Sequence, residues 1–227
     1  MNEIVELIRT VLIYALPVVF AITLHEAARG YAARYFGDMT AFSQGRLSLN
    51  PMVHIDPFGT IIIPVALYLA TGGAFLFGYA KPVPVDFSRL KNPKRDMAWV
   101  SLAGPAANFA MAFCWLLFGV ILQSADVTET YFIKVASAGL LTNLVMLAFT
   151  LFPIPPLAGG RILISLLPNK LAYKFAQIEP YGFFIVMGLV MVHWLQFWLV
   201  PVMLFANMLL QLIVSPFAML LGVSGLQ

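Results

Sequence analysis

The sequence predicts an all-α polytopic membrane protein, and three observations lead to this prediction. Hydrophobic residues make up 61% of the 227 residues and charged residues only 10%, which is too little polar surface for a soluble protein. Apolar runs of about 20 residues, long enough to cross a bilayer as helices, recur along the chain. Residues 180–227 contain no Asp, Glu, Lys or Arg. We therefore expect about five to six hydrophobic segments in a single membrane domain over residues 1–227.

The first span is expected over residues 4–36. Its apolar part ends at Leu24, and the charged stretch HEAARGYAARYFGD follows over residues 25–38. Ionisable residues at the end of a span lie near the membrane edge or in a water-filled cavity. The acidic N-terminus has no basic region and no cleavage signal, so we interpret this segment as a retained span.

The region after the first span has two open interpretations. Residues 39–60 alternate between polar and apolar and are interrupted by Pro51 and Pro57, which is typical of short strands or a tight β-hairpin. Residues 59–80 are apolar but contain Pro64, so they either span the membrane or form a re-entrant hairpin. The distribution of positive charges favours the re-entrant alternative.

The remaining segments follow from alternating apolar runs and polar loops. A core over about residues 10–170 is followed by C-terminal spans over 180–223. In order, we expect a basic loop at 81–96, a span at 97–123, an acidic loop at 124–130, a span at 131–152, an amphipathic interfacial segment at 161–178, and two spans separated near Pro201. Lysine and arginine collect in the 81–96 loop, which the positive-inside rule places in the cytoplasm. The single cysteine, Cys114, cannot form an intrachain disulfide.

The chemically informative stretch is HEAAR at residues 25–29. It begins like the zinc-protease motif HExxH, in which two histidines four residues apart bind the metal and the glutamate is the general base. Here the second histidine position is Arg29. By itself the pair His25 and Glu26 could be a chance occurrence on a charged helix, with the histidine hydrogen-bonded to a neighbouring helix.

Further motifs in the chain resemble those of one family. They occur in a fixed order over about residues 10–170 and read HEAARGYAARYFGD, QGRLSLNPMVHIDPFGT, FGYAKPVPVDF, KNPKRDMAWVSLAGPAANF and NLVMLAFTLFPIPPLAGGRIL. Together they resemble the site-2 protease family of intramembrane zinc metalloproteases, in its compact branch without a PDZ domain. Five ordered motifs are far more specific than any one of them.

The resemblance implies an activity and a set of site residues. The family cleaves single-pass transmembrane proteins within the bilayer, and it implies a bacterial inner-membrane location with a cytoplasmic active site and no nucleic-acid partner. Its general base falls on Glu26, and its three zinc-ligand positions fall on His25, Arg29 and Ala158. The implied substrate-binding residues are Asn108, Asn143, Gly159 and Gly160.

Two of these three positions cannot bind zinc. Arginine stays protonated and has no lone pair to offer, and alanine has no donor atom. Arg29 can instead form an ion pair with Glu26, three residues earlier on the same helix face. His54 is an alternative second ligand, against which stands a simpler role in ordering its loop by hydrogen bonding. The two replacements could be natural or introduced to disable an active parent.

Two classes of function remain open. In the first, the scaffold hydrolyses a transmembrane helix, with His25 as a zinc ligand and Glu26 as base. In the second, which we favour for this chain, the cleft holds membrane helices and cleaves nothing, so the chain is an inactive or strongly impaired pseudoprotease with zinc absent or weakly bound. A transporter is disfavoured because the intramembrane charges cluster at one motif.

Overall fold

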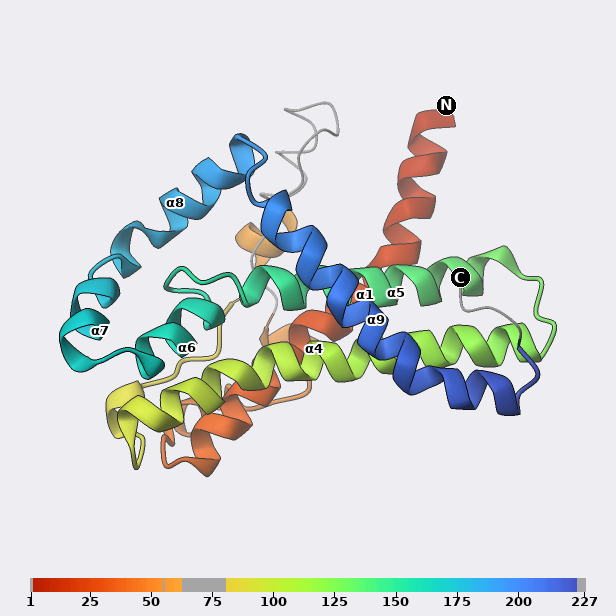
Figure 1. Ribbon diagram of the computed structural model, residues 1–227. Coiled ribbons are helices and arrows are strands. Elements are labelled where there is room, and N and C mark those ends of the chain that lie inside the picture. Colours follow the sequence, from red (N-terminus) through yellow and green to blue (C-terminus); the bar gives the residue numbers. More distant parts are fainter. Residues whose placement is uncertain (1, 55, 63–80, 224–227) are drawn as a thin grey trace.

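A computed structural model describes residues 2–54, 56–62 and 81–223 of the chain (Figure 1). Within these residues every regular element is helical and no strand occurs, which confirms the all-α class. The elements are α1 (Asn2–Tyr35), α2 (Thr40–Ser43), η1 (Pro51–Val53), η2 (Pro57–Ile62), η3 (Phe87–Arg89), α4 (Pro93–Ser124), α5 (Thr130–Thr150), α6 (Ala158–Leu166), α7 (Asn169–Ala176), α8 (Glu179–Met191) and α9 (Gln196–Leu220).

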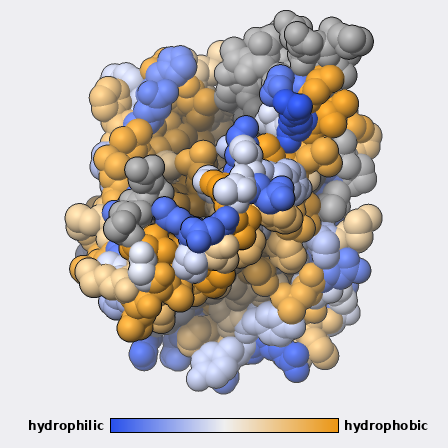
Figure 2. Space-filling model, turned by 90° about the vertical axis from the view of Figure 1, so that its right-hand side faces the viewer, coloured by the Kyte–Doolittle hydropathy of each residue, from blue (hydrophilic) through white to orange (hydrophobic). Residues whose placement is uncertain are grey.

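Four of these helices are long and apolar enough to cross a membrane. They are α4, α5, α9 and the part of α1 from Ile8 to Tyr35. Figure 2 looks onto the end of the bundle at the right of Figure 1, where hydrophilic residues gather in the middle of the face and hydrophobic residues surround them. Large hydrophobic side chains are exposed along the helices themselves. Such a surface is stable only against lipid, so the chain is an integral membrane protein.

Helix α4 is the centre of the bundle. It packs against α1, α5 and α6, and α9 crosses both α4 and α5 (Figure 1). The main core lies where α4, α5 and α9 meet and is built from small and aliphatic side chains: Ala112, Leu116, Val120, Leu144, Leu147, Ala206, Leu210, Val214 and Ala218. Small residues allow helix backbones to approach closely where no hydrophobic effect drives association within the lipid.

The local sequence explains where α4 begins. Asn92 precedes the helix and Pro93 occupies its first turn, where a missing N–H costs nothing. The buried carboxylate of Asp96 accepts a hydrogen bond from the Asn92 N–H at 2.8 Å. This contact provides a partner for the backbone N–H of the residue that precedes the helix.

Helix α1 changes direction along its length. Its N-terminal part rises away from the other helices in Figure 1, while its C-terminal half contacts α4 and α5. Pro17 lies inside the helix, where it lacks an N–H to donate and its ring disfavours straight continuation. The bend leaves the charged half of α1 inside the bundle.

The region after α1 differs in part from the sequence prediction. Residues 39–54 and 56–62 form the short helical turns α2, η1 and η2, and none of these residues forms the strands expected there. Pro51 and Pro57 begin two of these turns, where a fixed φ favours helix initiation. The choice between a span and a re-entrant hairpin over 59–80 falls mainly on residues 63–80, outside the described residues, and stays a prediction.

The predicted break near Pro201 is wrong. Helix α9 runs through Pro201 without interruption, and the break lies between Met191 and Gln196, where His193 adopts a positive φ of 58°. Proline is tolerated in a membrane helix because neighbouring groups satisfy the freed carbonyl. At 13 residues, α8 is shorter than a membrane span.

A glycine pair on neighbouring helices tests this packing. A methyl group added at Gly139 of α5 would collide with the Trp115 ring of α4, whereas one added at Gly119 would lie 3.9 Å from the Ala136 Cβ. We expect Gly139→Ala to destabilise the protein by about 1–3 kcal/mol through overpacking. Gly119→Ala should be neutral or stabilising, because alanine favours helix. Thermal unfolding in detergent measures both, and equal melting temperatures would contradict the packing of α4 on α5.

Candidate active site

The site is built on the buried half of α1. His25 and Glu26 are 5% and 9% exposed, and Arg29 lies one turn further along the same helix. The 3.6-residue helical repeat places positions 25, 26 and 29 on one side of α1. The structure therefore brings together the three polar residues of the HEAAR motif, as their spacing predicts.

A chain of hydrogen bonds fixes the orientation of His25. The Asn143 amide donates to the Gly139 carbonyl at 2.9 Å, which leaves the Asn143 oxygen to accept from the Asn108 amide at 2.9 Å. The Asn108 oxygen must then face His25 Nδ1, at 2.6 Å. Because an amide oxygen only accepts, Nδ1 carries the proton and Nε2 keeps its lone pair.

Helix α4 also holds the His25 ring by close contact. A Cβ atom added at Gly104 would come within 2.5 Å of His25 Cε1 and Nε2. Gly104 and Asn108 are four residues apart in the GPAAN motif and so lie on one face of α4. One residue supplies space for the imidazole and the other its hydrogen-bond partner.

Both asparagines are fully buried. Their amide groups already bond to His25, to each other and to backbone, in the manner of helix-to-helix hydrogen bonding. Their role in binding a substrate stays a prediction.

Arg29 neutralises Glu26. Its Nη1 lies 3.1 Å from Oε1 and 3.2 Å from Oε2 of the glutamate, and the two side chains are only 16% and 11% exposed. This confirms the ion pair predicted from their spacing. A carboxylate removed from water requires such a partner, because an unpaired buried charge is strongly unfavourable.

Glu26 has a further partner that sequence analysis missed. The Val83 N–H donates to Glu26 Oε2 at 2.7 Å, and Val83 is 2% exposed. The segment that carries Val83 is held at its ends by hydrogen bonds from Lys81 N to His54 O and from Asp86 N to Asp38 Oδ2. It therefore lies alongside α1, directly against the glutamate.

Gly30 permits this close approach. A Cβ added there would lie 2.8 Å from Leu47 Cδ1 and 3.0 Å from Val83 Cγ1. Two sequence signals were available for this packing: the small residue one turn after Glu26, and the motif FGYAKPVPVDF, which contains Val83.

A cavity of about 810 Å³ borders the site. His25 and Glu26 lie among its lining residues, and most of the others are apolar. The lining comes from α1, α5, α8 and the turn before α6: Tyr14, Val18, Ile22, His25, Glu26, Leu141, Thr142, Val145, Met146, Phe149, Thr150, Pro156, Leu157, Gly182, Phe183, Val186, Met187 and Val190. The polar residues of α1 thus face an apolar chamber between membrane helices.

The third predicted ligand position lies at the start of α6. Ala158 is the first residue of that helix, directly after Pro156 and Leu157, which line the cavity. Neither Gly159 nor Gly160 has a positive φ, so the backbone conformation does not require glycine here. Both pack so tightly that an added Cβ would collide with the backbone of residues 151–155. Close packing explains these glycines, and a role in substrate binding stays a prediction.

The donor groups do not fit a catalytic zinc ion. A catalytic zinc site takes three protein ligands, and the described residues contain no group of three or more His, Cys, Asp or Glu side chains that could hold a metal. By sequence, residues 63–80 carry none of these side chains. Within this site His25 is the one imidazole, and the carboxylate of Glu26 already accepts hydrogen bonds from Arg29 on both oxygens and from Val83 on one.

His54 does not line the cavity. It is fully buried, and its Nε2 donates to the Ser48 carbonyl at 2.8 Å. The histidine thereby orders the loop between α2 and η1.

The contribution of the hydrogen bonds between His25, Asn108 and Asn143 can be tested by measuring the stability of variants. Asn108→Leu would leave the His25 Nδ1–H and the Asn143 oxygen unpaired in the bundle, which we expect to cost about 1–3 kcal/mol. Ser137→Ala removes an exposed hydroxyl that bonds only to its own helix, at Ile133 O, and should leave stability unchanged. Melting temperatures in detergent compare the two. An Asn108→Leu variant as stable as the Ser137→Ala control would show that these hydrogen bonds do not stabilise the arrangement of α1, α4 and α5 at the site.

Known proteins share this sequence over most of its length. The chain is 39% identical over 172 residues to "Putative zinc metalloprotease YwhC" of Bacillus subtilis, covering 74% of each chain. It is 32% identical over 179 residues to "Putative zinc metalloprotease Rip2" of Mycolicibacterium smegmatis, covering 78% of this chain and 66% of that one. The Rip2 of Mycobacterium tuberculosis is 33% identical over 139 residues, about half of its length. No family model and no solved structure matches. The chain therefore belongs to the same family of zinc metalloproteases as YwhC and Rip2.

Proposed function

We propose that this chain is a site-2-protease-type membrane scaffold that binds a transmembrane helix of another protein and does not cleave it. The observation that carries the proposal is the guanidinium of Arg29, bound to both oxygens of Glu26 where the family would place a zinc ligand. The chain forms a single membrane domain over residues 1–227, with its site beside an intramembrane cavity.

The cavity supports the binding part of the proposal. It lies between α1 and α5, which are long enough to span the membrane, and the short apolar helix α8. Its apolar lining suits the side chains of a single-pass membrane helix. The hydroxyl of Thr142, on α5, is among the few polar groups in the lining. Such groups can bind a polar side chain of a guest helix, or its backbone at a point where the helix unwinds, because no water is available there.

The hydrogen bonding of Glu26 supports the loss of catalysis. A general base needs a free lone pair within reach of a water molecule. Here the carboxylate receives the Arg29 Nη1 on both oxygens and the Val83 N–H on one. Without a metal ion, the pKa of a water molecule also stays far above the value of about 7 that it has on zinc. Neither the base nor the nucleophile is prepared for peptide hydrolysis.

The alternative function is intramembrane zinc proteolysis. The names of the relatives favour it, since YwhC and Rip2 are both called zinc metalloproteases. Under this alternative His25 Nε2 would be one ligand and the others would come from outside the HEAAR motif. Zinc content distinguishes the two functions directly, because stoichiometric metal in the unaltered chain would favour the enzyme.

Restoring the ligands tests the proposed site. The double variant Arg29→His, Ala158→Asp supplies both missing donors and frees Glu26 from its ion pair. We expect it to bind one zinc per chain and to cleave a model transmembrane substrate, because the remaining motifs are intact. Atomic emission on purified protein measures the metal, and gel analysis of the substrate measures cleavage.

The controls separate the metal from the base. Each single variant should give little activity, since residues of a catalytic unit are not additive. Adding Glu26→Gln to the double variant should abolish cleavage and leave the zinc bound. Cleavage by the unaltered chain, even with Glu26→Gln, would refute the assignment of the site. A double variant that binds zinc and cleaves nothing would show a cleft adapted to binding.

We also propose that the chain lies in a bacterial inner membrane with the site on the cytoplasmic side. The basic side chains around η3 and the start of α4 support this orientation. Ser88 and Thr128 are both exposed, near opposite ends of α4. In a Cys114→Ser background, Ser88→Cys should be shielded from an impermeant thiol reagent in intact cells, whereas Thr128→Cys should be labelled. Equal labelling from outside would reject this topology.

A further inference from the structure

The exposed side of helix α7 carries both lysines and large apolar side chains. Lys170 and Lys174 lie one helical turn apart and are exposed, so their ammonium groups can approach a single anion. Leu171 and Tyr173 beside them are 54% and 70% exposed, while Ala172 faces the protein and is 9% exposed. The helix thus presents lysines and apolar groups together to its surroundings.

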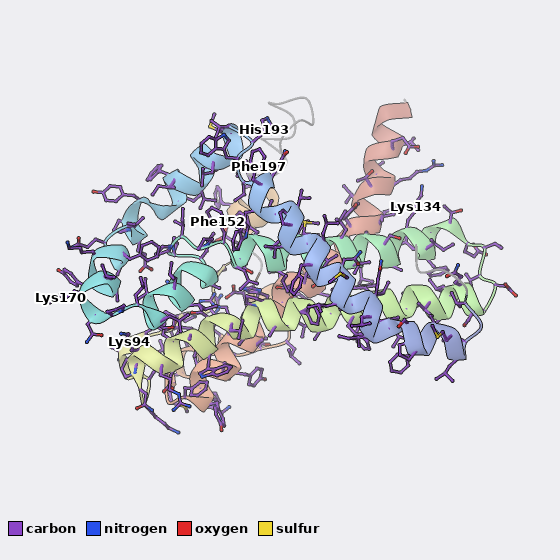
Figure 3. All side chains as sticks on the ribbon, viewed as in Figure 1. Lys94, Lys134, Phe152, Lys170, His193 and Phe197 are labelled. Atoms are coloured by element: carbon purple, nitrogen blue, oxygen red, sulfur yellow. The ribbon has the colours of Figure 1, made fainter. Side chains whose placement is uncertain are left out.

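The position of α7 is fixed by the start of α4. Lys94 Nζ donates to the Leu167 carbonyl at 2.7 Å and to Asn169 Oδ1 at 2.8 Å, which clamps the turn between α6 and α7. Figure 3 shows Lys94 and Lys170 at the same end of the molecule, with Lys134 at the opposite end. The α7 lysines therefore lie at one end of the long α4 span, at the level of a membrane surface.

The charges around α7 are predominantly positive. Residues 158–178 contain no acidic side chain, and the adjacent Glu179 is bound by Arg161 at 2.8 Å. Trp99, about one turn after the exposed Arg95 on α4, is 53% exposed. Exposed tryptophan and tyrosine close to lysine and arginine are typical of the boundary between lipid and water.

We propose that α7 binds the phosphate groups of anionic phospholipids at the membrane surface. Lys170 and Lys174 contact the headgroup phosphate, and Leu171 and Tyr173 lie among the first methylene groups of the acyl chains. Charge complementarity and continuity with the lipid-facing surface identify lipid as the partner. The proposal does not depend on the cavity or on the metal, so it stands or falls independently of the proposed function.

This contact has a consequence for α8. Helix α7 leads through residues 177 and 178 into α8, whose residues line one side of the cavity. Lipid bound to α7 therefore anchors the start of α8 at the membrane surface.

Lipid retention on the purified full-length chain tests the proposal. The chain in detergent is incubated with phosphatidylglycerol or phosphatidylcholine, and bound lipids are counted by native mass spectrometry. A lysine near an anionic surface contributes about fivefold in binding, so we expect Lys170→Gln, Lys174→Gln to weaken phosphatidylglycerol binding by about tenfold or more. Phosphatidylcholine binding should not change. Both lysines are exposed, so the variant should fold, and this is checked by its melting temperature.

The matched control is Lys134→Gln, which removes an exposed lysine at the other end of the bundle. The Lys134→Gln variant should bind more phosphatidylglycerol per chain than the single variant Lys170→Gln. Equal losses from the two single variants, or no loss from the double variant, would overturn the proposal. Displacement of the lipid by inorganic phosphate at equal concentration would also overturn it, because the site would then recognise free phosphate.

Discussion

The ion pair between Arg29 and Glu26 is the interaction on which the rest of the site depends. A carboxylate in the membrane part of α1 must be neutralised, and a metal ion would ordinarily provide the positive charge. Here the guanidinium provides it from one helical turn away, at 3.1 Å and 3.2 Å. Both members of the pair lie on α1, so the charge of Glu26 is neutralised without a cation from another segment.

Two polar contacts then join α1 to the rest of the protein. Glu26 receives the Val83 N–H on one side, and His25 donates to Asn108 on α4, which continues to Asn143 on α5. These contacts fix the rotation of α1 about its axis, because helices packed in lipid gain little specificity from apolar contact alone. The cavity beside His25 and Glu26 is consequently part of a defined arrangement of α1 and α5.

The sequence predicted the parts of this structure that depend on local pattern. The apolar runs predicted the ends of α1, α4 and α5 to within a few residues. The spacing of Glu26 and Arg29 predicted their contact. The Val83 contact could not be predicted, because it joins residues 57 positions apart through a backbone N–H that carries no side-chain signal. Pro201 was misleading, since a proline breaks a helix in water but is accommodated within a membrane bundle. The alternating polarity over 39–60 similarly indicated strands where the prolines start helical turns.

Under the proposed function, the residues at positions 29 and 158 are physically coupled. Once Arg29 occupies the charge position of the metal, an aspartate at 158 would have no ion to bind and would be a further carboxylate without a cation to pair with. Conversely, a histidine at 29 without a partner at 158 would leave Glu26 without a neutralising charge. Each replacement therefore removes the physical reason for keeping the other ligand, whereas His25 is retained because Asn108 and Gly104 hold it independently of any metal. The helix packing that forms the cavity therefore does not depend on a zinc ion.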